Sequence, residues 1–124
     1  MTSYTALAAG PLGVLICLLG TLVSLRRLSG RGTGETFERM RRVHGNAVEH
    51  VPLMLILLFL AEWLRAPTIL LLVAAITSIA ARFLHAGGYL IRRRHPLHFT
   101  GATLTYLVEG GLGILVTVQA FGWI

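Results

Sequence analysis

Long apolar stretches alternate with short polar connections along the 124-residue chain. We expect helices over 4–25, 37–65, 67–90 and 97–121, each rich in leucine, valine, isoleucine and alanine. At about 1.5 Å per residue, each stretch is long enough to cross the roughly 30 Å hydrocarbon layer of a membrane. The pattern therefore predicts an all-α chain, an integral membrane four-helix bundle that forms one domain over residues 1–124.

The second stretch differs from the others because its first half is polar. Only residues 51–61 are continuously apolar, which is too short to cross a membrane without the polar half that precedes them. We expect Thr36 to cap this helix, Glu38 to lie in its first turn, where the helix dipole favours an anion, and Pro52 to kink it. The helix can span only if its polar half also lies inside the protein.

Arginine is distributed unevenly between the connections that join the four helices. The first connection and its flanks hold Arg26, Arg27, Arg31, Arg39, Arg41 and Arg42, the third holds Arg92, Arg93 and Arg94, and the second holds Arg65. Membrane proteins keep basic connections in the cytoplasm. Four spans place the first and third connections on the same side. We therefore expect both to be cytoplasmic, in a multi-pass protein of a bacterial inner membrane.

Composition supports a membrane location and argues against a soluble domain and a nucleic-acid-binding protein. Hydrophobic residues make up 55% of the chain and charged residues 13%, which is more apolar surface than a soluble domain of this length can bury. The formal net charge of +6 would suggest nucleic acid in a soluble chain. No basic segment is interleaved with aromatic residues, so we expect no nucleic-acid partner. The single cysteine, Cys17, excludes an internal disulfide.

Two of the predicted helices carry polar residues along one face. A helix advances about 100° per residue, which places a set of polar residues of the second helix within roughly 100° of one another. They are Arg39, Arg42, Asn46, Glu49 and His50. On the third helix, Arg82, His85 and Tyr89 share a face within roughly 60°. Both faces would lie at membrane depth, where unpaired charge is costly.

Mutual neutralisation and ligand binding are two explanations for these polar faces. Pairing between helices, for example of Glu49 with Arg42 of a neighbouring helix, would satisfy the charges without a ligand. Arginines, however, far outnumber the acids beside them. An excess of arginine in a cleft of low dielectric constant favours an anionic partner. The residue types suit a small zwitterion, because arginine binds carboxylates, asparagine donates and accepts, and glutamate receives an ammonium group.

The segment FERMRRVHGNAVEHVPLMLILL resembles the signature of the MAPEG family, the membrane-associated proteins in eicosanoid and glutathione metabolism. The family pattern runs from an arginine-rich start through R-x-H/Q-x-N-x-x-E to a proline before an apolar run. Its positions match Arg42, His44, Asn46, Glu49 and Pro52. In the third helix, ARFLHAGGYL resembles the family's A-R-x-x-H/Y-x-x-x-Y more loosely. The likeness in length and layout covers nearly the whole chain.

The resemblance implies a homotrimer of four-helix subunits in membrane lipid, with glutathione bound between neighbouring subunits near the cytoplasmic side. Arg42, Asn46 and Glu49 would hold the peptide and the charged ends of glutathione. Of two arginines at the end of the first helix, either one matches a family position. The polar faces and the resemblance together predict these ligand-binding residues: Arg26, Arg27, Arg39, Arg42, Asn46, Glu49, His50, His85 and Tyr89.

The implied chemistry is activation of the glutathione thiol. A free thiol with a pKa of about 8.5 is mostly protonated at neutral pH. An arginine beside the sulfur favours the thiolate, which attacks a lipophilic electrophile arriving from the membrane. Well-known enzymes of the family carry this arginine several residues beyond the third-helix tyrosine, where the present chain has Pro96 or His98. Arg94 is the nearest arginine and is therefore the candidate catalytic residue.

Two main functional hypotheses follow. The first is a glutathione transferase or peroxidase, and the second is a non-catalytic membrane binding or scaffold member with a residual ligand site. A small transporter is disfavoured, since no internal repeat is evident. His95 and His98 lack a third ligand, so we expect no metal site. Glu109, an acid inside the fourth helix, should pair with Arg82 or be protonated.

Overall fold

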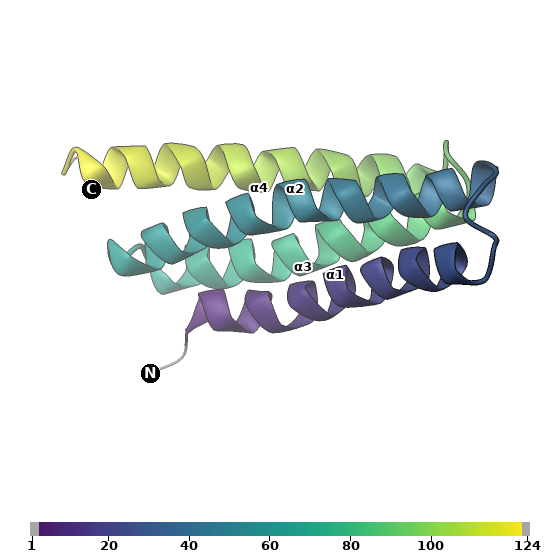
Figure 1. Ribbon diagram of the computed structural model, residues 1–124. Helices are drawn as coiled ribbons and strands as arrows, with labels where there is room; N and C mark the ends of the chain where they lie inside the picture. The colour runs from purple at the N-terminus through teal and green to yellow at the C-terminus, as the bar shows by residue number, and fades with distance from the viewer. Residues whose placement is uncertain (1–2, 123–124) are drawn as a thin grey trace.

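Four antiparallel helices make up the computed structural model, which describes residues 3–122 (Figure 1). They are α1 Tyr4–Leu28, α2 Glu35–Trp63, α3 Thr68–Ile91 and α4 Pro96–Ala120. Each helix is long and apolar enough to cross a membrane. The prediction of an all-α, multi-pass bundle is confirmed.

The two inner helices, α2 and α3, separate α1 from α4 (Figure 1). Within the described residues α1 and α4 do not touch, whereas α3 and α4 share the most extensive contact. The α1–α2 and α3–α4 connections lie at one end of the bundle, and the start of α1 and the end of α4 lie at the other (Figure 1). This is the layout that four spans require. The cytoplasmic location of the two basic connections stays a prediction from the arginines.

The core changes character along the bundle. Toward the termini it is mainly apolar and draws on all four helices, with residues such as Leu12, Met54, Leu58, Ala75 and Leu112. Toward the connections, a smaller apolar cluster of Leu15, Leu19, Val43, Ala47 and Ala86 lies alongside buried polar side chains. The polar half of α2 belongs to this second region. A candidate site is therefore expected near the connections.

Two glycines allow α3 and α4 to approach closely at the polar end. A Cβ atom at Gly101 of α4 would overlap the backbone of Ala81 and His85. A Cβ atom at Gly88 of α3 would overlap the backbone of His98. Small residues permit such backbone contact between membrane helices. The close approach brings the backbones that carry the two histidines next to each other.

The ends of the first two helices differ from the prediction. Helix α1 continues past its predicted end, so Arg26 and Arg27 lie in its last turn. The prediction of Thr36 as the cap of α2 is wrong: the cap is Gly34, whose φ of 88° turns the chain so that the helix starts earlier. Glu38 lies in the first turn, as expected.

The far end of α2 also departs from the predicted boundary. The helix ends at Trp63, and Arg65 lies in the short connection to α3 with a φ of 61°. Such a positive φ is uncommon outside glycine and is typical of a tight turn. The residues on both sides of Pro52 are helical, and the kink there stays a prediction.

Glu62, near the end of α2, caps the first turn of α1. Its carboxylate accepts hydrogen bonds from the backbone N–H groups of Tyr4 and Thr5, at 3.0 and 2.9 Å. The hydroxyl groups of Thr5 and Ser3 donate to it at 2.6 and 3.2 Å. An anion at a helix N-terminus satisfies unpaired N–H groups and complements the helix dipole. The start of α1 is therefore tied to the end of α2.

Candidate functional site

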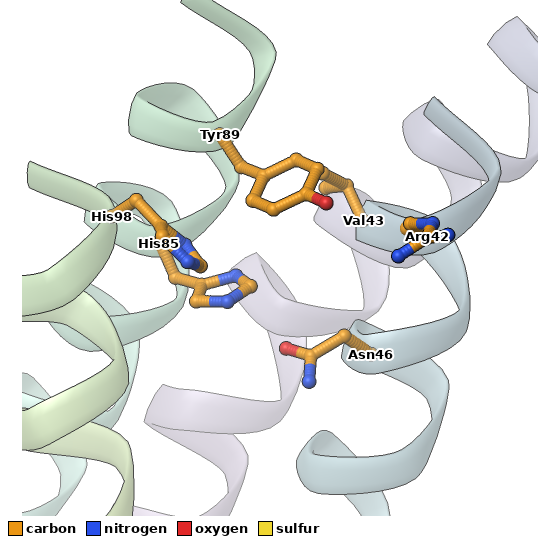
Figure 2. Close-up of a pocket in the computed structure, with 6 residues that line it drawn as sticks. All are labelled: Arg42, Val43, Asn46, His85, Tyr89 and His98. Atoms are coloured by element: carbon orange, nitrogen blue, oxygen red, sulfur yellow. The ribbon is translucent and has the colours of Figure 1, made fainter. Parts of the chain in front are cut away.

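A pocket of about 210 Å³ opens between α2, α3 and α4 in the polar half of the bundle (Figure 2). It is lined by Arg42, Val43, Asn46, His85, Tyr89 and His98. Figure 2 shows Arg42 and Asn46 on α2 standing across the cavity from His85 and Tyr89 on α3. The structure thus brings the polar faces of the two helices to one cavity.

Arg82 is buried beside the pocket and holds one of its lining residues. Its side chain is 1% exposed, and its guanidinium donates to Asn46 Oδ1 at 2.8 Å and to Thr105 Oγ1 at 3.2 Å. The Thr105 hydroxyl in turn donates to the carbonyl of Gly101 at 2.8 Å. These bonds join α2, α3 and α4. Because Asn46 accepts through Oδ1, its NH₂ group is left to donate to a ligand.

His85, Tyr89 and His98 form an aromatic cluster on one wall of the pocket. The ring centroids of His85 and His98 are 4.5 Å apart, and those of Tyr89 and His98 are 4.8 Å apart. Within residues 3–122, neither histidine Nδ1 atom has a hydrogen-bonding partner, although both are buried. Buried polar atoms are normally paired. These two nitrogens are therefore exceptions to that rule within the aromatic wall.

Comparison with protein families decides which group of membrane proteins shares this layout. The model of the MAPEG family matches residues 5–118. The chain belongs to the MAPEG family. Neither the search of curated proteins nor the search of solved structures found a match. MAPEG membership indicates, in broad terms, a membrane protein of glutathione or eicosanoid metabolism.

The candidate catalytic residue of this MAPEG protein, Arg94, lies beside the pocket. An adjoining hollow of about 480 Å³ is lined by Tyr89, Arg93, Arg94, His98 and Phe99. Tyr89 and His98 line both cavities, so these two rings stand between Arg94 and the pocket. His98, which also lines the pocket, is not among the ligand-binding residues predicted from the sequence. The close approach at Gly88 is the feature that brings it to the pocket.

Arg39 lies in a third, smaller cavity at the same end of the bundle. The cavity measures about 120 Å³ and is lined by Glu35, Glu38, Arg39, Arg42, Tyr89 and Arg93. The Arg39 guanidinium donates to the carbonyl of Ile91 at 3.1 Å. Carbonyl groups in the last turn of a helix lack intrahelical partners, and arginine often supplies one. Arg39 therefore secures the end of α3 at the rim of the site.

Some predicted site residues of the MAPEG protein line none of these three cavities: Arg26, Arg27, Glu49 and His50. Glu49 is exposed on α2. The guanidinium carbon of Arg27 lies 5.8 Å from the centre of the Phe37 ring. His50 Nδ1 lies 2.8 Å from Glu109 Oε1. Among the described residues Glu109 thus contacts an imidazole and forms no ion pair with Arg82, and the alternative expectation, that Glu109 is protonated, stays a prediction. Sequence reasoning missed this contact because it joins two separate helices.

Proposed function

We propose that the protein is a membrane glutathione-binding enzyme, a transferase or peroxidase that activates the glutathione thiol against lipophilic electrophiles. The observation that carries the proposal is the pocket between α2, α3 and α4, in which arginine, asparagine, histidine and tyrosine meet inside otherwise apolar helices. Arg42 offers a guanidinium to a carboxylate, and Asn46 offers an amide held in place by Arg82. MAPEG membership supports glutathione as the ligand.

The proposed active form is a homotrimer. In the single chain, Arg42 and Glu49 are exposed on α2, and Glu49 lies near the middle of the helix. A charge at the centre of a membrane span costs about 2.5–3.5 kcal/mol on insertion scales. A neighbouring copy packed on this face would cover both groups and would place Glu49 at the ammonium end of the ligand. The basic connections, proposed to be cytoplasmic, would then face the compartment that supplies glutathione.

Thiol activation is assigned to the positive charge at the rim of the pocket. Arg94 and Arg93 line the hollow that adjoins the pocket across Tyr89 and His98. A cation near the sulfur favours the thiolate over the thiol. The thiolate then attacks an electrophile that enters from the lipid. Arg94 is the proposed catalytic residue.

A ligand-binding protein without turnover is the second candidate. It is favoured by the placement of Arg94, which is exposed and lines the adjoining hollow rather than the pocket itself. In that case Arg42 and Asn46 would bind glutathione, and its thiol would stay protonated. The two candidates therefore agree on binding and differ only in ionisation of the sulfur.

The deciding experiment is the ultraviolet absorbance of the glutathione thiolate on the purified protein in detergent. The enzyme proposal expects a thiolate signal that is lost in Arg42→Ala, through loss of binding, and in Arg94→Ala, with binding kept. Arg65→Ala, at the opposite end of the bundle, is the matched control and should keep the signal. Saturable binding without a thiolate signal would favour the second candidate, and no binding would contradict both.

A further inference from the structure

A second polar centre lies deeper in the bundle than the pocket. His50 Nδ1 lies 2.8 and 3.1 Å from the two carboxylate oxygens of Glu109. Both residues occur near the middle of their helices, and their side chains are only 17% and 11% exposed. When His50 is protonated, the two form an ion pair. The function proposed above assigns this pair no role.

The pair lies one helical turn from the pocket. His50 follows Asn46 by four residues, which is about 6 Å along the axis of α2 on the same face. Glu109 follows Thr105 by four residues on α4 in the same way. Arg82 donates to both Asn46 and Thr105. The two turns that carry the pair are thus fixed relative to the pocket by hydrogen bonds.

The contact with Glu109 determines which nitrogen of His50 can act on a ligand. A carboxylate that accepts from Nδ1–H sets the orientation of the ring and leaves Nε2 to exchange a proton. Within residues 3–122 Glu109 is the only hydrogen-bonding partner of His50. The ring of Tyr106, which is exposed on α4, packs edge-on at 5.6 Å between centroids. The imidazole therefore lies close to the surface from which a lipophilic molecule would arrive.

A proton donor at this depth is useful only to certain electrophiles. Little water reaches the middle of a bilayer, so an oxyanion released there has no solvent to protonate it. A substrate that expels chloride needs no proton at all. A hydroperoxide, in contrast, releases an alkoxide when its O–O bond breaks. A proton donor at the position of the pair would therefore assist the reduction of a hydroperoxide but not the displacement of chloride.

On the basis of the function proposed above, we propose that His50, oriented by Glu109, is the general acid that protonates the alkoxide formed when glutathione reduces a lipophilic hydroperoxide. The thiolate sulfur attacks the terminal oxygen of ROOH, an S–O bond forms, the O–O bond breaks, and its electron pair leaves on RO⁻. His50 Nε2–H transfers its proton to RO⁻ and gives ROH. The proton lost by the thiol restores His50. A second glutathione thiol then converts the sulfenic acid to the disulfide and water.

The test compares two electrophiles with the purified full chain and glutathione: cumene hydroperoxide and 1-chloro-2,4-dinitrobenzene. In Glu109→Gln and in His50→Gln, the ratio of hydroperoxide to dinitrobenzene turnover should fall by about 100-fold, the usual contribution of a general acid. The double variant should fall no further, because the two residues act as a unit. Glu109→Gln keeps the volume of the side chain, which preserves the fold, but its neutral amide can present either an oxygen or an NH₂ group to Nδ1 and so no longer holds Nε2–H as the proton donor. Tyr106→Phe is the matched control, with an unchanged ratio.

Other outcomes would overturn the assignment. Equal loss of both reactions would make the pair structural. A loss of hydroperoxide turnover in Tyr106→Phe would identify the phenol of Tyr106, rather than His50, as the proton donor. Conjugation of dinitrobenzene without any hydroperoxide turnover by the unchanged protein would contradict this inference and leave the proposed enzyme standing. Absence of both activities would contradict the inference and the enzyme together.

Discussion

Arg82 is the residue on which the geometry of the pocket depends most. It is buried, and its guanidinium donates to side chains of two other helices, Asn46 on α2 and Thr105 on α4. A guanidinium holds its donors in a rigid planar fork, whereas an ammonium group is a compact charge on a flexible stem. Lysine at this position would keep the charge and lose the simultaneous, directed contact with both partners.

We therefore expect Arg82→Lys to weaken glutathione binding by about tenfold, the equivalent of one hydrogen bond to a charged group. The physical reason is that Asn46 would no longer be held with its NH₂ group free to donate. Isothermal titration calorimetry of the detergent-solubilised protein measures the change. Arg65→Lys serves as the control. An unchanged affinity would show that the orientation of Asn46 does not matter to the ligand.

The geometry of a single helix predicts from the sequence which pocket residues share a face, but not which residues of different helices meet. Arg42 and Asn46 are four apart, so the helical repeat alone predicts that they share a face, and both line the pocket. The contacts of Arg82 with Asn46 and of His50 with Glu109 depend on how one helix is shifted along another. Hydrophobic periodicity does not encode that shift. The predicted cap at Thr36 is wrong for a different, local reason: Gly34, with its positive φ, caps the helix at an earlier position.

At the scale of helices, the close contact of α3 with α4 positions the histidines. We expect Gly101→Ala to destabilise the bundle by about 1–3 kcal/mol, the usual cost of overpacking, because the added methyl group would meet the backbone of His85. Glutathione affinity should fall as well, since α3 and α4 must separate at the pocket. Thermal unfolding in detergent, followed by binding measurements, tests both effects.

Gly110→Ala is the matched control for this prediction. Gly110 lies on the same helix, and a Cβ atom there would have no neighbour within 4 Å. The substitution should leave the unfolding midpoint unchanged or raise it, because alanine is the better helix former. If both glycine variants were equally stable, the contact between α3 and α4 would have more freedom than the structure indicates.

The contact of Glu62 with the start of α1 also belongs to the scale of helices. Glu62→Gln removes the anion that accepts from two backbone N–H groups and two hydroxyls, and should lower stability by about 1–2 kcal/mol. A lower midpoint of thermal unfolding is the expected result. Glutathione affinity should not change, because Glu62 lies at the opposite end of the bundle from the pocket. A changed glutathione affinity with an unchanged midpoint of thermal unfolding would contradict the assignment of Glu62 to stability alone.

At the scale of the whole molecule, the proposed homotrimer can be tested through its mass and through the exposed Glu49 on α2. We expect native mass spectrometry from detergent to give three times the 13.5 kDa chain mass. Glu49→Gln should weaken glutathione binding by roughly tenfold in this assembly, through loss of a charged hydrogen bond across the subunit boundary. A monomer that binds glutathione equally well with and without the Glu49 carboxylate would contradict the trimeric site.

The contact between Glu62 and the start of α1 also bears on the biogenesis of the protein. The residues that it joins, Thr5 and Glu62, are 57 positions apart in the chain. While the nascent chain is shorter than that, the N–H groups of Tyr4 and Thr5 lack the carboxylate that accepts from them in the folded protein. The cap forms only when the whole of α2 has left the ribosome. This order of events favours entry of α1 and α2 into the membrane as a helical hairpin, rather than one helix at a time.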